Sequence, residues 1–409
     1  MSERVYLDYI ATTPVDPTVV QAMEPFFHGT FGNPSSVHTY GQEAKIALDK
    51  ARDTVAGFFG VKSSEVLFTG SATEADNWAI RGVIDRLGEL GYSMDRLHVV
   101  TSAIEHKAVL ETLRAMEKRG LRVTYVRPDR EGVVDAGAVG AAIQENTVLV
   151  SVMYVNNEVG SIQPIREIAG VVAEARKTRY AKQGAAAAHT AGSLPLYFHT
   201  DAVQGVQFLD CRADALGYDL LTFSGHKIYG PKGIGGLVVR GHVDLAPLIF
   251  GGGQEDGQRS GTENVAGIVG LAAAIALLKK PQHQSEIDRI ATFSNSIITT
   301  IVGIDGVTLN GPQGAKRIQN NIHVTVGGRA GSSGTVRDSE TLVIGLDMKG
   351  FAVSAGSACS AGALEPSYVL RAMGVPAAQA KSALRISIGR FTTQEEIELF
   401  LQAFRAMLK

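Results

Sequence analysis

The chain carries one lysine in a setting that suits covalent chemistry. The apolar run Leu220–Ser224 reads as a buried strand, and Gly225, His226 and Lys227 follow its end directly. A lysine that is taken out of water loses part of its preference for the charged form, and its neutral amine can then condense with an aldehyde. The glycine-rich run 230–236 leaves open space beyond it. Alone, this pattern also fits a solvated lysine at a strand end.

Other groups that could do acid–base or binding chemistry also follow apolar runs. Asp201 could keep a pyridine nitrogen protonated, although an Asp at a strand end more often marks a turn. His106 supplies an imidazole, although a lone histidine in such a loop is more often structural. Ligands of open parallel sheets gather at the carboxyl ends of the strands. We therefore expect Thr73, His106, Asn157, Asp201 and Lys227 to lie on one face.

The segment 69–74 could bind a phosphate group. It reads as a strand that stops at a glycine and enters a helix through Ser71, Ala72 and Thr73. The unpaired amides and the dipole of a helix start attract an anion. An ordinary helix N-cap by Ser71 or Thr73 explains the same residues equally well. The run 230–233 lacks the spacing of a nucleotide-binding P-loop.

The second unusual segment is 353–362, where Cys359 lies among Gly, Ala and Ser. Cysteine is usually a small core residue, but these neighbours pack little and favour an exposed, flexible loop. A reactive thiol that must move fits this setting. Cys211 has no such neighbours, and we interpret it as incidental. Because neither cysteine has a paired neighbour, we expect no metal site and no disulfide framework.

Composition narrows the class of protein. The chain has 409 residues, so more than one domain is expected. Hydrophobic residues make up 45% and charged residues 20%, as in a well-packed enzyme, and the net charge of −2 argues against a nucleic-acid or anionic-membrane surface. The start lacks the pattern of a signal peptide, and no apolar run reaches the ~18–20 residues that cross a bilayer. We expect a cytoplasmic protein.

Strands and helices alternate from residue 66 onward, which indicates an α/β fold with a mostly parallel sheet. The expected strands are 66–69, 97–102, 123–126, 147–155, 198–203, 220–224 and 237–239, and the expected helices are 42–59, 72–87 and 106–119. After residue 251 the regular alternation of strands and helices ends. Further strands are expected at 321–326 and 383–387, and further helices at 263–279, 339–349 and from 393 onward.

These elements predict two domains. A large domain over 15–258 would hold the lysine and the phosphate-binding turn, and a smaller α+β domain would combine 1–14 with 259–409 and carry the Cys359 loop. The segments 182–193 and 327–337 are low in complexity, and we expect both to be surface loops.

Taken together, these motifs resemble one family along nearly the whole chain. The chain is similar to the group I cysteine desulfurases, which are pyridoxal 5'-phosphate enzymes of the class V aminotransferase superfamily with fold type I, related to aspartate aminotransferase. The resemblance rests on 6–9, 11–14, 32–36, 72–77, 105–107, 155–158, 201–204, 224–227, 259–262, 357–359 and Arg385.

The resemblance implies a role for each matching residue. Lys227 would carry the cofactor and then move protons at the substrate α-carbon, and His106 would stack on the ring and act in acid–base steps. Asp201 would pair with the pyridine nitrogen. The other cofactor contacts would be Ala72, Thr73, Asn157, Gln204, Ser224, His226 and, from the second subunit of a homodimer, Thr262. The substrate contacts would be Asn33, Asn157 and Arg385.

The implied reaction converts L-cysteine to L-alanine and captures the sulfur as a persulfide on Cys359, for transfer to an acceptor such as an iron–sulfur scaffold. Two features depart from the family pattern. The chain stops at Lys409, without the C-terminal tail of many relatives, and the alanine-rich stretch near 185 is an addition. Two alternatives stay open: another pyridoxal-phosphate enzyme of this fold, such as a selenocysteine lyase or an aminotransferase, and a catalytically silent partner protein.

Overall fold

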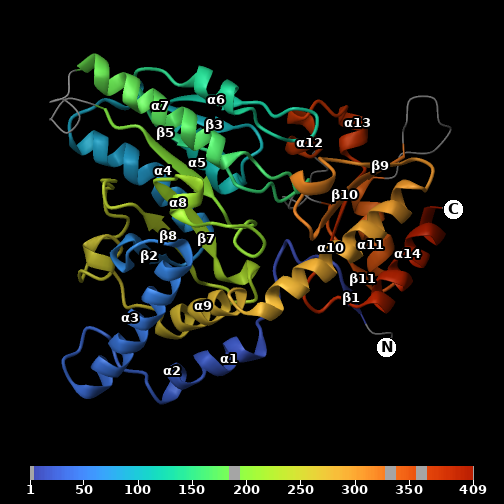
Figure 1. Ribbon diagram of the computed structural model, residues 1–409, viewed down its shortest axis with the longest axis horizontal. Coiled ribbons are helices and arrows are strands. Elements are labelled where there is room, and N and C mark those ends of the chain that lie inside the picture. Colours follow the sequence, from blue (N-terminus) through green and yellow to red (C-terminus); the bar gives the residue numbers. More distant parts are fainter. Residues whose placement is uncertain (1–3, 184–193, 328–337, 356–365, 409) are drawn as a thin grey trace.

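The computed structural model describes residues 4–183, 194–327, 338–355 and 366–408, which form a larger and a smaller group of strands (Figure 1). The larger sheet has the strand order β2-β8-β7-β6-β5-β3-β4. Its strands are β2 (Val66–Thr69), β3 (His98–Ser102), β4 (Arg122–Val126), β5 (Thr147–Ser151), β6 (Tyr197–Asp201), β7 (Leu220–Ser224) and β8 (Gly235–Val239). β8 runs antiparallel to β2 and β7, and the other neighbouring pairs are parallel. The predicted α/β fold with a mostly parallel sheet is confirmed.

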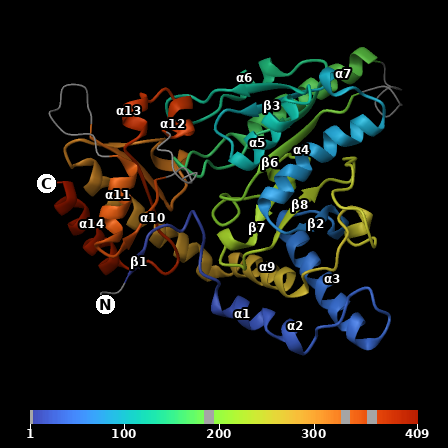
Figure 2. The same ribbon diagram turned by 180° about the vertical axis from the view of Figure 1, so that it is seen from behind.

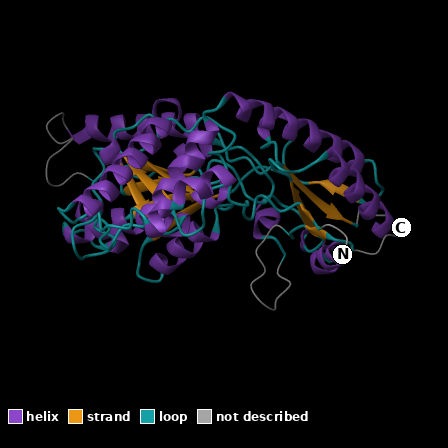
Figure 3. Ribbon diagram, turned by 90° about the horizontal axis from the view of Figure 1, so that it is seen from below, coloured by secondary structure: helices purple, strands orange, loops and turns teal. Residues whose placement is uncertain are grey.

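Helices cover both faces of the larger sheet (Figure 3). The helices that precede or surround it are α1 (Pro17–Met23), α2 (Pro25–His28), α3 (Thr39–Phe59), α4 (Ala72–Glu89), α5 (Lys107–Glu117), α6 (Ala136–Ala142), α7 (Ile165–Gln183), α8 (Ala213–Leu216) and α9 (Val265–Leu278). Neighbouring strand residues enter opposite cores: Leu220 packs with α4 and α5, whereas Leu221 packs with α3 and α9. Burial on both faces explains why these strands are almost continuously apolar.

The smaller group consists of the antiparallel sheet β12-β10-β9 and the parallel pair β1-β11. Its strands are β1 (Val5–Tyr6), β9 (Val307–Leu309), β10 (Asn321–Val326), β11 (Phe351–Ala352) and β12 (Ala383–Ser387). Its helices are α10 (Pro281–Val302), α11 (Ser339–Asp347), α12 (Tyr368–Ala372), α13 (Ala377–Ala380) and α14 (Gln394–Leu408). These elements have an apolar core of their own.

The N-terminal segment connects the two groups of strands. β1 lies beside β11, close to the C-terminal elements (Figure 2). Beyond β1, the Ile10 amide donates to Ser387 Oγ at 3.0 Å, and Thr13 bonds through its amide and hydroxyl to the His226 carbonyl of the larger sheet. The N-terminal segment therefore forms hydrogen bonds with both groups of strands. The domain limits 15–258 and 1–14 plus 259–409 stay a prediction.

Several element boundaries differ from the expected ones for local reasons. α3 begins at Thr39 instead of residue 42, because His38 Nδ1 accepts from the Gly41 amide and caps the helix earlier. β5 ends at Ser151 instead of residue 155, since the chain turns around Asn156, whose side-chain oxygen accepts two backbone amides. α7 continues through Gln183, so the start of the expected loop 182–193 is helical. The rest of that loop, and 328–337, lie outside the described residues.

No described helix is long and apolar enough by itself to cross a bilayer. α9 and α10 together have that length and composition, but they meet at 74°. α9 packs Ile268, Leu271 and Ile275 into the core of the larger group.

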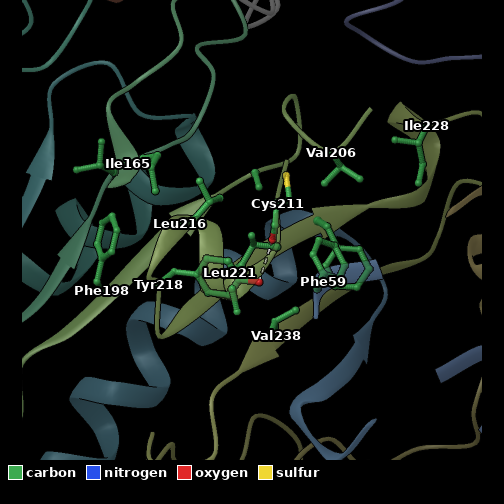
Figure 4. Close-up of a cluster of buried hydrophobic side chains, with 14 of the residues drawn as sticks. Phe59, Ile165, Phe198, Val206, Cys211, Leu216, Tyr218, Leu221, Ile228 and Val238 are labelled. Atoms are coloured by element: carbon green, nitrogen blue, oxygen red, sulfur yellow. Dashed lines mark hydrogen bonds between the residues drawn. The ribbon is translucent and has the colours of Figure 1, made fainter. Parts of the chain in front are cut away.

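Cys211 is a core residue, in keeping with its interpretation as incidental to the chemistry. Figure 4 shows its sulfur among apolar side chains that include Phe59 and Val206. Its side chain is buried, and burial raises the pKa of the thiol well above the ordinary value of 9.0. A thiol of this kind is a poor nucleophile.

The core of the smaller group gives the first prediction. Phe400 is fully buried, and its ring lies 5.7 Å from that of Phe351 and 5.8 Å from that of Phe404. Phe400→Ala should lower the free energy of unfolding of this group by about 3–5 kcal/mol, because it removes buried area and leaves a cavity. Urea unfolding followed by circular dichroism measures this loss. Leu399→Ala on the same helix, where the side chain is 47% exposed, should cost less than about 1 kcal/mol; equal effects would contradict the packing assignment.

Candidate active site

A cavity of about 540 Å³ lies next to the carboxyl ends of the parallel strands of the larger sheet. Its lining residues that follow or end these strands are His106, Lys107, Met153, Asn157, Glu158, Asp201, Val203, Gln204, His226 and Lys227. The start of α4 adds Ser71, Ala72, Thr73 and Asp76, and the N-terminal segment and the smaller group add Asp8, Ile10, Ala11, Ser354, Tyr368 and Arg385. The five residues that were expected on one face, Thr73, His106, Asn157, Asp201 and Lys227, all lie in this wall.

Lys227 ends a short 3-10 helix, Gly225–Lys227, that follows β7 directly. Its Nζ donates to the backbone carbonyls of Ile10 and Ala11, at 2.6 Å each. Burial lowers the pKa of the amine from 10.5 to about 8, and the Arg385 charge acts in the same direction. A substantial fraction of neutral amine is therefore present at mildly alkaline pH, as a nucleophilic lysine requires.

Asp201 and His106 form the acid–base part of the wall. Asp201 is the last residue of β6, and its Oδ1 accepts from the Val203 amide at 2.9 Å. Burial raises the pKa of this carboxyl group, whereas its interactions with His106 and Lys227 lower it. His106 caps α5, since its Nδ1 accepts from the Ala108 amide at 3.2 Å. Burial lowers the pKa of the imidazole, which favours its neutral form.

The start of α4 is a capped helix end that borders the cavity, and its role as a phosphate site stays a prediction. Ser71 is the N-cap, and its Oγ accepts from the Glu74 amide at 3.2 Å. The next residues, Ala72 and Thr73, line the cavity at the positive end of an 18-residue helix. β8 can approach this turn because residue 235 is glycine: a Cβ there would lie 2.9 Å from the Ala72 nitrogen.

Arg385 closes the opposite side of the cavity. It lies on β12 of the smaller group, is 4% exposed, and donates from Nη1 to the Asn157 carbonyl at 2.8 Å and from Nη2 to Asp8 Oδ1 at 3.0 Å. Asn157 Oδ1 is buried next to it and has no hydrogen-bond partner among the described residues. A carboxylate ligand would find a guanidinium group and an amide side chain here.

Two further predicted contacts belong to the wall and are held by the N-terminal segment. Gln204 Nε2 donates to the Ile10 carbonyl at 3.2 Å. His226 Nδ1 is hydrogen-bonded to Thr12 Oγ1 at 3.1 Å, and burial lowers the pKa of this imidazole to about 4. A neutral His226 can donate one N–H to a phosphate oxygen.

The structure does not bring every predicted residue into this wall. Ser224 is buried at the end of β7 and does not line the cavity. Thr262 lines a second cavity of about 140 Å³, together with Thr69 and Gly70. Asn33 is exposed, and its Oδ1 accepts from the Ser35 amide. Cys359 lies outside the described residues.

The sequence analysis assigned no individual role to six polar residues of the wall: Asp8, Asp76, Lys107, Glu158, Ser354 and Tyr368. Asp76 could have been found, because it lies three positions after Thr73 on the same face of a helix that is otherwise apolar there. Asp8 and Tyr368 gave no signal of their own, since their neighbours in the cavity are far away in sequence. No group of three or more His, Cys, Asp or Glu side chains that could hold a metal ion occurs in the described part of the chain.

Comparison with known proteins places this site in a family. The model of the aminotransferase class-V family matches residues 5–400. The chain belongs to this family. It is 40% identical over 410 residues to a protein of Dictyoglomus turgidum named cysteine desulfurase IscS, covering all of this chain and 95% of that one. It is 43% identical to a protein of Pectobacterium carotovorum with the same name, with 98% and 92% covered. Within the family, the chain therefore belongs with the cysteine desulfurases.

Solved structures agree with this assignment. A NifS-like protein superposes with a TM-score of 0.86 at 34% identity, and the match covers 99% of each chain. A structure described as SspA in complex with cysteine gives a TM-score of 0.77 at 34% identity, covering 95% of this chain and all of that one. The predicted family and fold class are confirmed.

The low pKa of Lys227 gives a second prediction. In the cofactor-free protein, the rate at which an amine-reactive reagent modifies Lys227 should be half-maximal near pH 8, because burial lowers the pKa from 10.5 to about 8. Mass spectrometry of the labelled peptides measures this rate. The control is Lys177, whose side chain is 79% exposed. A midpoint for Lys227 above pH 10 would contradict the described environment.

Proposed function

We propose that this cysteine desulfurase uses pyridoxal 5'-phosphate to convert L-cysteine to L-alanine and passes the sulfur, as a persulfide on Cys359, to an acceptor protein. The observation that carries the proposal is the buried amine of Lys227, which shares one cavity with Asp201, His106 and Arg385.

The residues of the cavity fit this cofactor. The start of α4 and His226 offer amide and imidazole donors for a phosphate group, and Asp201 offers a carboxylate for a protonated ring nitrogen. The neutral form of the Lys227 amine could react with the aldehyde carbon of the cofactor. Two groups are buried in the wall without a hydrogen-bond partner among the described residues, the Asp76 carboxylate and Asn157 Oδ1. Buried polar atoms are rarely left unpaired, so a polar ligand is expected there.

When bound, the cofactor supplies an electron sink that weakens bonds at the substrate α-carbon. The protein contributes the positions and the protons. Arg385 would bind the substrate carboxylate, and Asn157 would fix its orientation. The Lys227 amine, once neutral, would take the proton from the α-carbon and return a proton when alanine forms. His106 would cover the ring from the side of α5 and keep water away from it.

The sulfur step requires a second nucleophile, and we assign it to Cys359. Its thiolate would attack the substrate sulfur, so that a sulfur–sulfur bond forms while the carbon–sulfur bond breaks and the carbon is protonated. One L-cysteine and one thiol then give one L-alanine and one persulfide, which balances without an added oxidant. The relative described as SspA in complex with cysteine supports L-cysteine as the substrate. An iron–sulfur scaffold as acceptor and a cytoplasmic location complete the proposal.

The third prediction concerns these two nucleophiles. Lys227→Ala should lower alanine release from L-cysteine by about 10²–10⁴-fold, since it removes the group that moves the α-proton. Cys359→Ala should keep cofactor binding and lose the added sulfur. Both are followed by alanine assay and by mass spectrometry of the protein after brief exposure to L-cysteine.

Cys211→Ala is the control thiol variant and should keep the persulfide. Alanine formation without a persulfide on the Cys359 peptide would instead favour a lyase, such as a selenocysteine lyase, that releases the chalcogen directly. Neither product would favour the aminotransferase alternative. A wild-type protein that failed to bind the cofactor would fit the silent-partner alternative.

We also propose that the active form is a homodimer. The segment from α2 to the start of α3 exposes four large apolar side chains: Phe27 is 66%, Phe31 65%, Val37 89% and Tyr40 56% exposed. A cluster of this size costs free energy in water and commonly marks an interface. A second copy of the chain would cover it, and Thr262 of that copy would then be available to complete a phosphate site.

The fourth prediction tests this surface. The double variant Phe31→Asp with Val37→Asp should shift the solution mass from about twice the 43.3 kDa of the chain towards 43.3 kDa, because it places charges in an apolar contact. Light scattering after gel filtration measures the mass. Leu90→Asp, at a side chain that is 57% exposed beyond α4, is the matched control and should leave the mass unchanged. A double variant that stays dimeric would place the interface elsewhere.

A further inference from the structure

The cavity contains a buried acid to which no function has been assigned above. Asp76 lies on α4, three residues after Thr73 and four after Ala72, so it shares their helix face about one turn further along. Its side chain is 1% exposed and lines the cavity. Neither carboxylate oxygen has a hydrogen-bond partner among the described residues.

The surface of the sheet next to Asp76 is a row of polar side chains. His199 and Asp201 alternate on β6 and therefore point to the same face. His199 Nδ1 is hydrogen-bonded to Ser151 Oγ on β5 at 2.9 Å, and its Nε2 to Thr222 Oγ1 on β7 at 3.1 Å. The same Nε2 lies 3.7 Å from Asp76 Oδ1. The row thus runs from Ser151 on β5 through His199 to Thr222 on β7 and to Asp76, on the sheet face that also carries Asp201.

His199 does not neutralise Asp76. Burial lowers the pKa of His199 to about 3, so this imidazole is uncharged at neutral pH. Of the basic groups of the wall, His106 and Lys227 act on Asp201, whose carboxyl pKa they lower. Asp76 therefore faces Asp201 without a cation of its own among the described side chains.

Two buried carboxylates that share one site disfavour the doubly ionised state, because little water is present to offset their mutual repulsion. Burial and the charge of Asp201 hold the pKa of Asp76 well above its ordinary value; the neighbouring Thr222 hydroxyl acts in the opposite direction, and the charge of Glu105 adds a smaller upward contribution. Asp76 therefore favours its protonated form more than it would in water, whereas Asp201 has His106 and Lys227 beside it, which lower its pKa.

We propose that Asp76 is a positioning residue of the cofactor site, which holds a proton and, when the cofactor is bound, donates it in a hydrogen bond to the Asp201 carboxylate, so that the two acids present one negative charge to the protonated ring nitrogen. One negative charge matches the single positive charge of a protonated pyridine nitrogen. The inference rests on the proposed function, because it takes pyridoxal 5'-phosphate as the ligand.

Two substitutions of similar size test whether Asp76 acts as a hydrogen-bond donor, as a negative charge or only by filling space. Asp76→Asn keeps a donor and removes the acid, whereas Asp76→Leu removes both. The readout is the dissociation constant of the cofactor from cofactor-free protein, measured by equilibrium dialysis at pH 7. The same constant is measured for an analogue whose ring nitrogen is replaced by C–H. Asp85→Asn, at a partly exposed position of the same helix, is the matched control.

We expect Asp76→Asn to bind the cofactor within about threefold of the wild type, and Asp76→Leu to bind it at least about tenfold more weakly, as for one lost hydrogen bond to a charged group. The dissociation constant of the analogue should be the same for Asp76→Asn and Asp76→Leu. Because Asp76→Leu replaces an unpaired buried acid by an apolar group, its melting temperature without cofactor should not fall. Asp85→Asn should match the wild type in both measurements.

Three results would overturn the inference. Equal weakening in Asp76→Asn and Asp76→Leu would mean that Asp76 acts as a charge, and wild-type affinity in Asp76→Leu would mean that it does not act at all. Equal loss of the cofactor and the analogue would mean a packing role. A wild-type protein that does not bind the cofactor would instead contradict the proposed function, so the two failures are distinguishable.

Discussion

The site depends on the contact between the Lys227 amine and the carbonyl oxygens of Ile10 and Ala11, at 2.6 Å each. These carbonyls belong to a segment that begins as β1 in the smaller group of strands and then crosses to the larger one. The same segment contributes Asp8, which bonds Arg385. One stretch of chain therefore fixes both the Lys227 amine and the Arg385 guanidinium group on the opposite side of the cavity.

The electrostatics of the cavity share a single physical cause. Burial lowers the pKa of Lys227 and of His106, and it raises the pKa of Asp201 and of Asp76. Every one of these groups is thus moved towards its neutral form. Little water reaches these side chains, so their charged forms are poorly stabilised by the cavity alone. A ligand that carries a phosphate, a ring cation and a carboxylate would place opposite charges beside them and stabilise the charged forms.

The strand ends could be predicted from the sequence because an apolar run stops at each of them. Thr73, His106, Asp201 and Lys227 were found in this way, and the fold class followed from the same alternation. The partners that close the cavity could not be found, since Asp8 and Arg385 are 377 positions apart. Asp76 was overlooked although its apolar helix neighbours mark a buried face, because a single polar residue inside a helix is usually assigned to the solvated side. Even with the structure, Asn33 and Thr262 lie outside the cavity of one chain.

The parallel pairing of β1 with β11 has a consequence for how the protein is made. Val5 pairs with Phe351, and Asp8 pairs with Arg385, so the wall of the cavity joins the first and last parts of the chain. A ribosome releases the N-terminal residues long before those partners exist, and domains otherwise fold as they emerge. Until residue 385 has left the exit tunnel, the N-terminal segment lacks its partners and the lysine lacks its complete surroundings. The wall of the cavity is thus complete only in chains whose translation is nearly finished.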